Sequence, residues 1–144
     1  MMKIETERLY IRHFVNEDAS ICFEGWGTDE HLGDFIMGYP MNMDQMNSFV
    51  NAMVKNTNAW VIVEKESGAC IYGTEAVKKM ISEYLSKDRL YLIEAKCNID
   101  NKPSLNLLEK VGFIKDGVLR KRRIDKNTGE YRDLVVYSIT TNDK

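Results

Sequence analysis

Hydrophobic and polar positions follow two rhythms along the chain, one typical of strands and the other of helices. Residues 8–14 and 59–64 form short apolar-rich runs, which predict strands. Residues 46–54 carry apolar side chains at i, i+3, i+4, i+7 and i+8, which predicts an amphipathic helix. Further helices are expected from Glu17, over about 74–86 and from Asn101 or Lys102, and further strands over 90–98, 117–124 and 131–140.

The order of these elements predicts a mixed α/β (α+β) fold, and 144 residues suit one domain over residues 1–144. Asn16 is the expected cap of the helix from Glu17. The run 90–98 is apolar along most of its length, so we expect a strand covered on both faces. Gly112 fits the left-handed position that ends a helix, and residues 125–129 fit a hairpin loop.

Composition narrows the class of partner. The 20 basic and 22 acidic residues nearly balance, which argues against nucleic acid or anionic lipid as a partner. No apolar run approaches the ~20 residues of a membrane helix, and a cytoplasmic location without a membrane partner is expected. The three cysteines, Cys22, Cys70 and Cys97, are far apart. We expect buried thiols rather than a disulfide framework, and no metal site.

Polar residues follow the strand predicted at 90–98, where a helix begins. Ligands of open α/β sheets bind beyond the carboxyl ends of strands, and a helix N-terminus offers backbone N–H groups. Asn101 and Ser104 add side-chain hydrogen bonds there, and Ser104 is placed to relay a proton. The same residues also suit an ordinary helix cap, and from the residues alone both interpretations stay open.

A second strand–helix junction lies at Tyr72, Gly73 and Thr74. Gly73 permits a close backbone approach, and Thr74 suits either a helix cap or an anion contact. Arg120, Lys121, Arg122 and Arg123 form a basic run on a predicted strand. Alternation places Arg120 and Arg122 on one face, so a solvated hairpin is favoured over contact with an anionic ligand or nucleic acid.

Aromatic and acidic residues near the start of the chain suit two roles. They line a pocket for an amine, or they pack a helix and its loop, and packing is favoured. The residues concerned are Trp26, Asp29, Glu30, Asp34, Phe35 and Tyr39.

Several stretches resemble the GNAT N-acetyltransferase superfamily, and within it the RimJ/RimL-type branch. They are residues 5–12 (ETERLYIR), 101–104 (NKPS) with 107–113 (LLEKVGF), and 117–120 (GVLR) with 131–137 (YRDLVVY). The resemblance implies a GNAT-like central sheet flanked by helices. It also implies an enzyme that transfers an acetyl group from acetyl-CoA, its co-substrate, to a primary amine by direct attack. The amine is a protein N-terminus or a small amine.

The resemblance assigns roles to five residues. Tyr72, Gly73, Thr74, Asn101 and Ser104 are the expected coenzyme-binding residues, and Ser104 is the expected catalytic residue, which protonates or steadies the leaving thiolate. On this interpretation the Gly73 and Asn101 turns lie side by side and hold the phosphates of the coenzyme.

The chain departs from the family pattern between Ile71 and Tyr72. Roughly 30 residues, about two strands with their connections, have no counterpart. In the family they include the strand that binds the pantetheine arm and most of the pyrophosphate loop. Three interpretations of this departure stay open. The protein is an enzyme with a trimmed coenzyme site, or it is a non-catalytic binding or interaction module, or the given sequence skips residues that the molecule possesses.

Two structural consequences follow from the departure. A skipped segment would separate the Cα atoms of Ile71 and Tyr72 by much more than the ~3.8 Å of a trans peptide. If the segment is absent from the molecule, the strands at 59–64 and 90–98 either pair with one another or expose their edges. Exposed edges invite dimerisation or aggregation, so a homodimer is one expected assembly.

Overall fold

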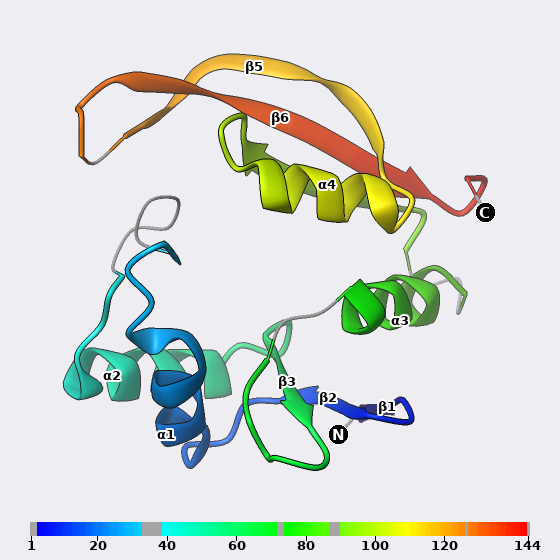
Figure 1. The fold of residues 1–144 in the computed structure, drawn as a ribbon. Coiled ribbons are helices and arrows are strands. Elements are labelled where there is room, and N and C mark those ends of the chain that lie inside the picture. Colours follow the sequence, from blue (N-terminus) through cyan, green and yellow to red (C-terminus); the bar gives the residue numbers. More distant parts are fainter. Residues whose placement is uncertain (1–2, 33–38, 72–73, 87–89, 126, 144) are drawn as a thin grey trace. The chain divides into compact units, whose positions relative to one another are not determined.

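The structure is a computed structural model that describes residues 3–32, 39–71, 74–86, 90–125 and 127–143. The chain divides into two compact units, unit 1 (Met1–Ala76) and unit 2 (Val77–Lys144). Each unit is described by itself. Helices accompany a three-stranded antiparallel sheet in each unit, as Figure 1 shows, and the predicted mixed α/β fold class is confirmed.

The sheet of unit 1 has the order β1-β2-β3, with β1 at Ile4–Glu5, β2 at Leu9–His13 and β3 at Trp60–Glu64. Tyr10 lies opposite Val63 in the antiparallel register. After β3, one isolated bridge joins Cys70 to Val63. β1 escapes prediction because two residues carry no periodicity, and only their pairing with β2 defines the strand.

The first helical segment of unit 1 combines α1 (Asp18–Cys22) with the π-helical η1 (Phe23–Gly27). The cap predicted at Asn16 is wrong, because Glu17 occupies the N-cap position and makes no side-chain cap hydrogen bond. Asp18 instead accepts the backbone N–H of Val15 at 2.8 Å. The second helix, α2 (Met43–Val54), begins with a capping box in which Asn42 and Gln45 bond each other's backbone N–H groups.

The core of unit 1 forms where α1, η1 and α2 meet one face of the sheet. Its fully buried side chains include Cys22, Met46 and Val50, which are at most 1 % exposed. Gly25 shows how closely η1 approaches the chain after β3, because a Cβ there would lie 2.5 Å from the carbonyl oxygen of Cys70. A glycine is therefore required for this contact.

The sheet of unit 2 has the order β4-β6-β5, with β4 at Leu92–Asn98, β5 at Ile114–Ile124 and β6 at Tyr131–Thr140. The helices α3 (Thr74–Ser86) and α4 (Lys102–Lys110) supply apolar residues to the same core as β4 and β6. The bounds of α3 and β6 match the predicted ranges. Gly112 has a φ of 101°, as expected, and the Phe113 N–H returns to the Leu108 carbonyl to close α4.

The strand predicted at residues 90–98 differs from its expected environment. Coverage of both faces is wrong for β4, because Leu92, Glu94 and Lys96 are exposed while Ile93, Ala95 and Cys97 face the core. One face of β4 is therefore exposed to solvent. β3 and β4 belong to different sheets and do not pair with one another. Residues 69–71 line the outer side of β3, whereas no described strand pairs with the outer side of β4.

In the part of the chain that the structure describes, no helix is long and apolar enough to cross a membrane.

Candidate functional site

The junction between β4 and α4 is built by local hydrogen bonds. Asn101 is the N-cap of α4, and its side-chain oxygen accepts the backbone N–H of Ser104 at 3.2 Å. The Asn101 N–H donates to the Asn98 carbonyl at 3.0 Å, which closes the turn between strand and helix. Pro103 stands in the first turn of the helix, where its missing N–H costs little. The cap interpretation of Asn101 is therefore confirmed.

The N-terminus of α4 is not an open cradle for an anion. The Lys102 N–H donates to the Asp100 carbonyl at 2.9 Å, and the Leu105 N–H donates to the Asn101 carbonyl at 3.0 Å. Asn101 takes the Ser104 N–H, and Pro103 has none. The expectation of unpaired N–H groups at this helix end is therefore wrong, because the turn and the cap use them internally.

Two side-chain groups remain for a ligand at this junction. Asn101 makes its hydrogen bonds through its side-chain oxygen and its backbone, and its amide Nδ2 has no partner among the described residues. Ser104 is half-buried and lies near Cys97 on β4, whose thiol donates to the Asn101 carbonyl at 3.9 Å. Burial raises the pKa of the Cys97 thiol, and the contact with Ser104 opposes that shift.

The second expected junction is described only in part. Tyr72 and Gly73 lie outside the described residues, so neither their contacts nor the Ile71–Tyr72 separation is described. Thr74 is the first residue of α3 and belongs to unit 1, whereas Asn101 and Ser104 belong to unit 2. The structure therefore brings Asn101 and Ser104 together and leaves their relation to Thr74 undescribed.

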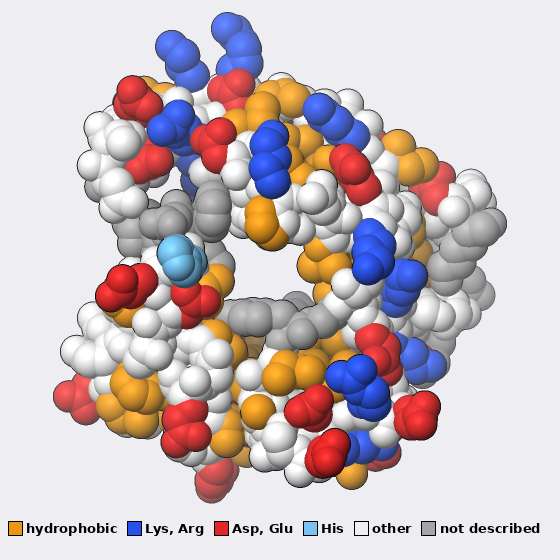
Figure 2. Space-filling view, in the orientation of Figure 1, with side chains coloured by type: hydrophobic (Ala, Val, Ile, Leu, Met, Phe, Trp, Pro, Cys, Tyr) orange, Lys and Arg blue, Asp and Glu red, His pale blue; other side chains and the backbone are white. Residues whose placement is uncertain are grey.

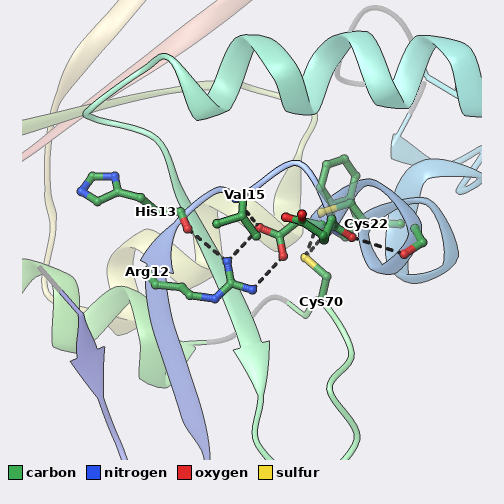
Figure 3. Close-up of polar contacts among 9 residues, drawn as sticks. Arg12, His13, Val15, Cys22 and Cys70 are labelled. Carbon is green, nitrogen blue, oxygen red and sulfur yellow. Dashed lines mark hydrogen bonds and ion pairs between the residues drawn. The ribbon is translucent and has the colours of Figure 1, made fainter. Parts of the chain in front are cut away.

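A buried ion pair joins β2 to α1 in unit 1 (Figure 3). The Arg12 guanidinium donates to both carboxylate oxygens of Asp18, at 2.8 and 2.7 Å. Asp18 is only 2 % exposed, and it also accepts the Val15 N–H. The hydrogen bond to Asp18 raises the pKa of Arg12 above its ordinary value. This bidentate pair orients α1 against the strand.

Two thiols that the sequence analysis did not connect lie together in the same core. The Cys22 thiol donates to Cys70 Sγ at 3.6 Å, and Figure 3 shows both residues beside the ion pair. Trp26 Nε1 donates to the same sulfur at 3.0 Å. Donation to Cys70, together with burial, raises the pKa of the Cys22 thiol, whereas the bonds from Cys22 and Trp26 lower that of Cys70 against the effect of burial.

The expectation for the cysteines is confirmed, because Cys22, Cys70 and Cys97 are all free and buried. Cys22 and Cys70 are 48 positions apart, and no spacing rule connects such a pair. Their burial keeps both sulfurs from solvent, so the pair packs the core of unit 1.

The aromatic residues considered for an amine pocket are partly placed. Trp26 and Tyr39 are buried in the core with ring centroids 5.7 Å apart, which confirms packing for these two. The Asp29 carboxylate accepts the His31 N–H at 2.9 Å. Asp34 and Phe35 lie outside the described residues. None of the four described candidates lines the polar hollow of about 440 Å³ formed by Asn16, Asn47, Ser48 and Asn51.

The basic run on β5 is exposed at all four positions, as a solvated hairpin requires. Figure 2 shows Lys and Arg side chains at the top of the view, over the β5–β6 hairpin, with acidic side chains among them. The predicted alternation is wrong, because the strand register shifts between Leu119 and Arg123 and Lys121 has a φ of 53°. Asp133 accepts the Lys121 N–H at 2.8 Å and holds this bulge.

The chain is similar along its whole length to acetyltransferases. An uncharacterised N-acetyltransferase of Bacillus licheniformis, p20, is 25% identical over 173 residues, covering 96% of this chain and 96% of that protein. A GNAT-family acetyltransferase of Bacillus anthracis superposes with a TM-score of 0.83 at 23% identity, covering 98% of this chain and 99% of the other.

A ribosomal-protein α-N-acetyltransferase, RimL, solved with coenzyme A, gives a TM-score of 0.82 at 12% identity, covering 99% of this chain and 100% of the other. No family model matches the sequence. The chain has the fold of GNAT acetyltransferases, and together these likenesses support an acetyltransferase of that superfamily.

Proposed function

We propose that residues 1–144 form one GNAT-like domain that transfers an acetyl group from acetyl-CoA to a primary amine, in the manner of the RimJ/RimL-type branch. The observation that carries the proposal is the likeness to p20 over 96% of both chains. It is supported by the pairing of a cap amide and a half-buried hydroxyl at Asn101 and Ser104. The acceptor is the N-terminus of a protein or a small amine.

The residues at the α4 junction fit the arm and the sulfur of such a coenzyme. The Asn101 Nδ2 group would donate to a carbonyl of the pantetheine arm. Thr74, at the start of α3, would stand on the phosphate side together with Tyr72 and Gly73, because a helix N-terminus favours negative charge. When bound, acetyl-CoA supplies an acetyl group activated as a thioester.

The reaction is a direct displacement at the acetyl carbon. The nitrogen lone pair of the neutral amine forms the new C–N bond, the C–S bond breaks, and water carries the ammonium proton to a base. Ser104 donates a hydrogen bond to the departing thiolate. The proton that leaves nitrogen balances the proton that the coenzyme thiol gains.

A variant series tests the role of Ser104. Ser104→Ala should reduce turnover by roughly 10–100-fold with little change in acetyl-CoA affinity, because the lost bond forms mainly to the developing thiolate. Release of free coenzyme and calorimetric binding are the two measurements. Asn106→Ala, an exposed position on the same helix, is the matched control. An unchanged rate in Ser104→Ala would remove Ser104 from the mechanism.

Asn101 requires a substitution that separates capping from coenzyme binding. Asn101→Ser retains a side-chain oxygen for the Ser104 N–H and removes the Nδ2 donor, so helix stability should persist while acetyl-CoA affinity falls by about tenfold. Asn101→Ala removes both groups and should lower stability as well. Equal affinity for acetyl-CoA in wild type and Asn101→Ser would mean that Asn101 acts only as a cap.

One observation favours a second candidate, a GNAT-like binding or interaction module without catalysis. The alignment with p20 extends over 173 positions, 29 more than the 144 residues of this chain. These additional positions support the interpretation that p20 contains a segment that this chain lacks. The sequence analysis puts such a segment between Ile71 and Tyr72. Calorimetry with acetyl-CoA separates the candidates, since no binding heat at millimolar ligand would favour the module.

A further inference from the structure

The strand β4 has the one long and regular open edge among the described residues. The outer strand β1 has only two residues, and β5 is interrupted by two shifts of register. The outer side of β3 is occupied by residues 69–71 through two backbone hydrogen bonds, from Glu64 to Ala69 and from Ile71 to Ile62. β4 pairs with β6 at seven consecutive positions without a shift, and no described strand pairs with its other side.

The backbone groups on this open edge follow from the antiparallel ladder. The Thr141 N–H donates to the Tyr91 carbonyl and the Ile99 N–H donates to the Asp133 carbonyl, so odd-numbered residues of β4 exchange their bonds with β6. The N–H and C=O groups of the even-numbered residues therefore point away from β6. They belong to Leu92, Glu94, Lys96 and Asn98. Such a row is a template for another strand.

Charge is placed symmetrically on this edge. Glu94 and Lys96 flank Ala95, and their side chains lie on the wet face with exposed fractions of 48 and 51 %. Within the chain they form an ion pair at 2.6 Å. An antiparallel partner with the same sequence, centred on Ala95, places Glu94 of each copy opposite Lys96 of the other. The edge is therefore complementary to itself.

Neighbouring registers lack this match. Centring the pair on Glu94 sets two glutamates opposite one another, and centring it on Lys96 does the same with two lysines, which is unfavourable for directly opposed like charges. The Ala95 centre also makes Glu94 and Lys96 a hydrogen-bonded pair, since the backbone groups of both point outward. Backbone geometry allows all three centres, because each pairs even-numbered residues with even-numbered residues, and charge then selects the Ala95 centre.

We propose that two copies of the chain associate through β4, antiparallel and centred on Ala95. The two sheets then join into one sheet of six strands in the order β5-β6-β4-β4-β6-β5. The occupant of the edge is a second copy, because the charges on the edge match those of its own sequence. This interface goes beyond the proposed acetyl transfer, and its failure would leave that assignment unchanged.

Charge reversal tests the interface. Glu94→Lys and Lys96→Glu each set two pairs of like charges opposite one another, so each should weaken dimerisation by about tenfold at low salt. The double substitution E94K/K96E restores opposite charges and should restore the dimer. Sedimentation equilibrium over a wide range of protein concentration gives the dissociation constants. Lys115→Glu on β5 is the matched control and should change nothing.

Mixing the two single variants adds a readout that unfolding cannot imitate. The E94K copy is positive at both positions and the K96E copy is negative at both, so the mixture should form heterodimers although each variant alone is weakened. A wild type that stays monomeric at all concentrations would overturn the proposal. So would a dimer that tolerates Glu94→Lys, or a double substitution that fails to restore association.

A cross-link checks the register directly. In the proposed pair the two Ala95 residues are opposite each other, so Ala95→Cys should form an intermolecular disulfide when oxidised glutathione accepts the two electrons and is reduced to two thiols. Ala59→Cys, just before β3, is the control and should not form it. Absence of the cross-link in a folded protein would overturn the register. A monomer with amides of Glu94 and Lys96 protected from hydrogen exchange would place another segment of the same chain on the edge and would also overturn the proposal.

Discussion

Asp18 shows how much one buried carboxylate can organise. It accepts two hydrogen bonds from Arg12 and one from the Val15 backbone, so the end of β2 and the start of α1 depend on one side chain. Removing its charge would leave the Arg12 guanidinium, whose side chain is 29 % exposed, without its counter-ion. The carboxylate is therefore a determinant of stability in unit 1.

We expect Asp18→Asn to lower the free energy of unfolding by about 2–3 kcal/mol, because charge-assisted hydrogen bonds are lost while the shape is kept. Urea unfolding followed by tryptophan fluorescence measures the change. Glu17→Gln, at the exposed neighbouring position, is the control and should shift stability by less than about 0.5 kcal/mol. Equal losses in both variants would contradict the role given to the ion pair.

Individual elements differ in how far the sequence predicts them. The bounds of α3 and β6 follow from periodicity and flanking turn residues, whereas the sequence offers Asn101 as a cap only beside the alternative of a ligand site. η1 and the bulge near Lys121 are not visible in the pattern, because tertiary contacts and the Asp133 side chain decide them.

The same limit applies to the candidate site. Sequence places Asn101 and Ser104 at a helix start, but it does not show that the neighbouring backbone N–H groups are already used. Nor does it show that Ser104 lies near the Cys97 thiol, because the two residues belong to different elements. The thiol pair of Cys22 and Cys70 joins residues 48 positions apart and is a property of the folded core alone.

At the scale of the hairpin, Asp125 predicts a pH dependence. Backbone hydrogen bonds from Thr128 and Asn127 lower the pKa of its carboxyl below the ordinary value. Its stabilising effect is therefore present above the unfolded pKa of about 4, and it is lost as the pH falls through the lower folded pKa. Wild type should exceed Asp125→Asn in thermal midpoint near neutral pH, and the two should converge at about pH 2. A constant gap between the two midpoints would contradict this assignment.

At the scale of the whole molecule, the described residues form two hydrophobic clusters, one in each unit. Both tryptophans, Trp26 and Trp60, belong to unit 1, so their fluorescence reports on that unit. Far-UV circular dichroism reports on the strands and helices of both. Comparison of the two signals therefore asks whether the chain unfolds in one cooperative step.

We expect the units to respond separately to core substitutions. Val50→Ala in unit 1 and Val135→Ala in unit 2 each create a small cavity at a position 1 % exposed, at a cost of roughly 2 kcal/mol. Val50→Ala should shift the fluorescence transition. Val135→Ala should shift part of the circular dichroism transition and leave the fluorescence midpoint in place. Coincident shifts of both signals in both variants would show a single cooperative molecule.

The approach of η1 to Cys70 has a consequence for tolerance to mutation. Residue 25 has no room for even a methyl group beside the Cys70 carbonyl, although glycine brings no chemistry of its own to the position. A saturation screen would therefore find position 25 as intolerant as a catalytic residue, and a reading of such data by activity alone would misplace the active site. The geometry identifies the cause as crowding where the chain departs from the first sheet.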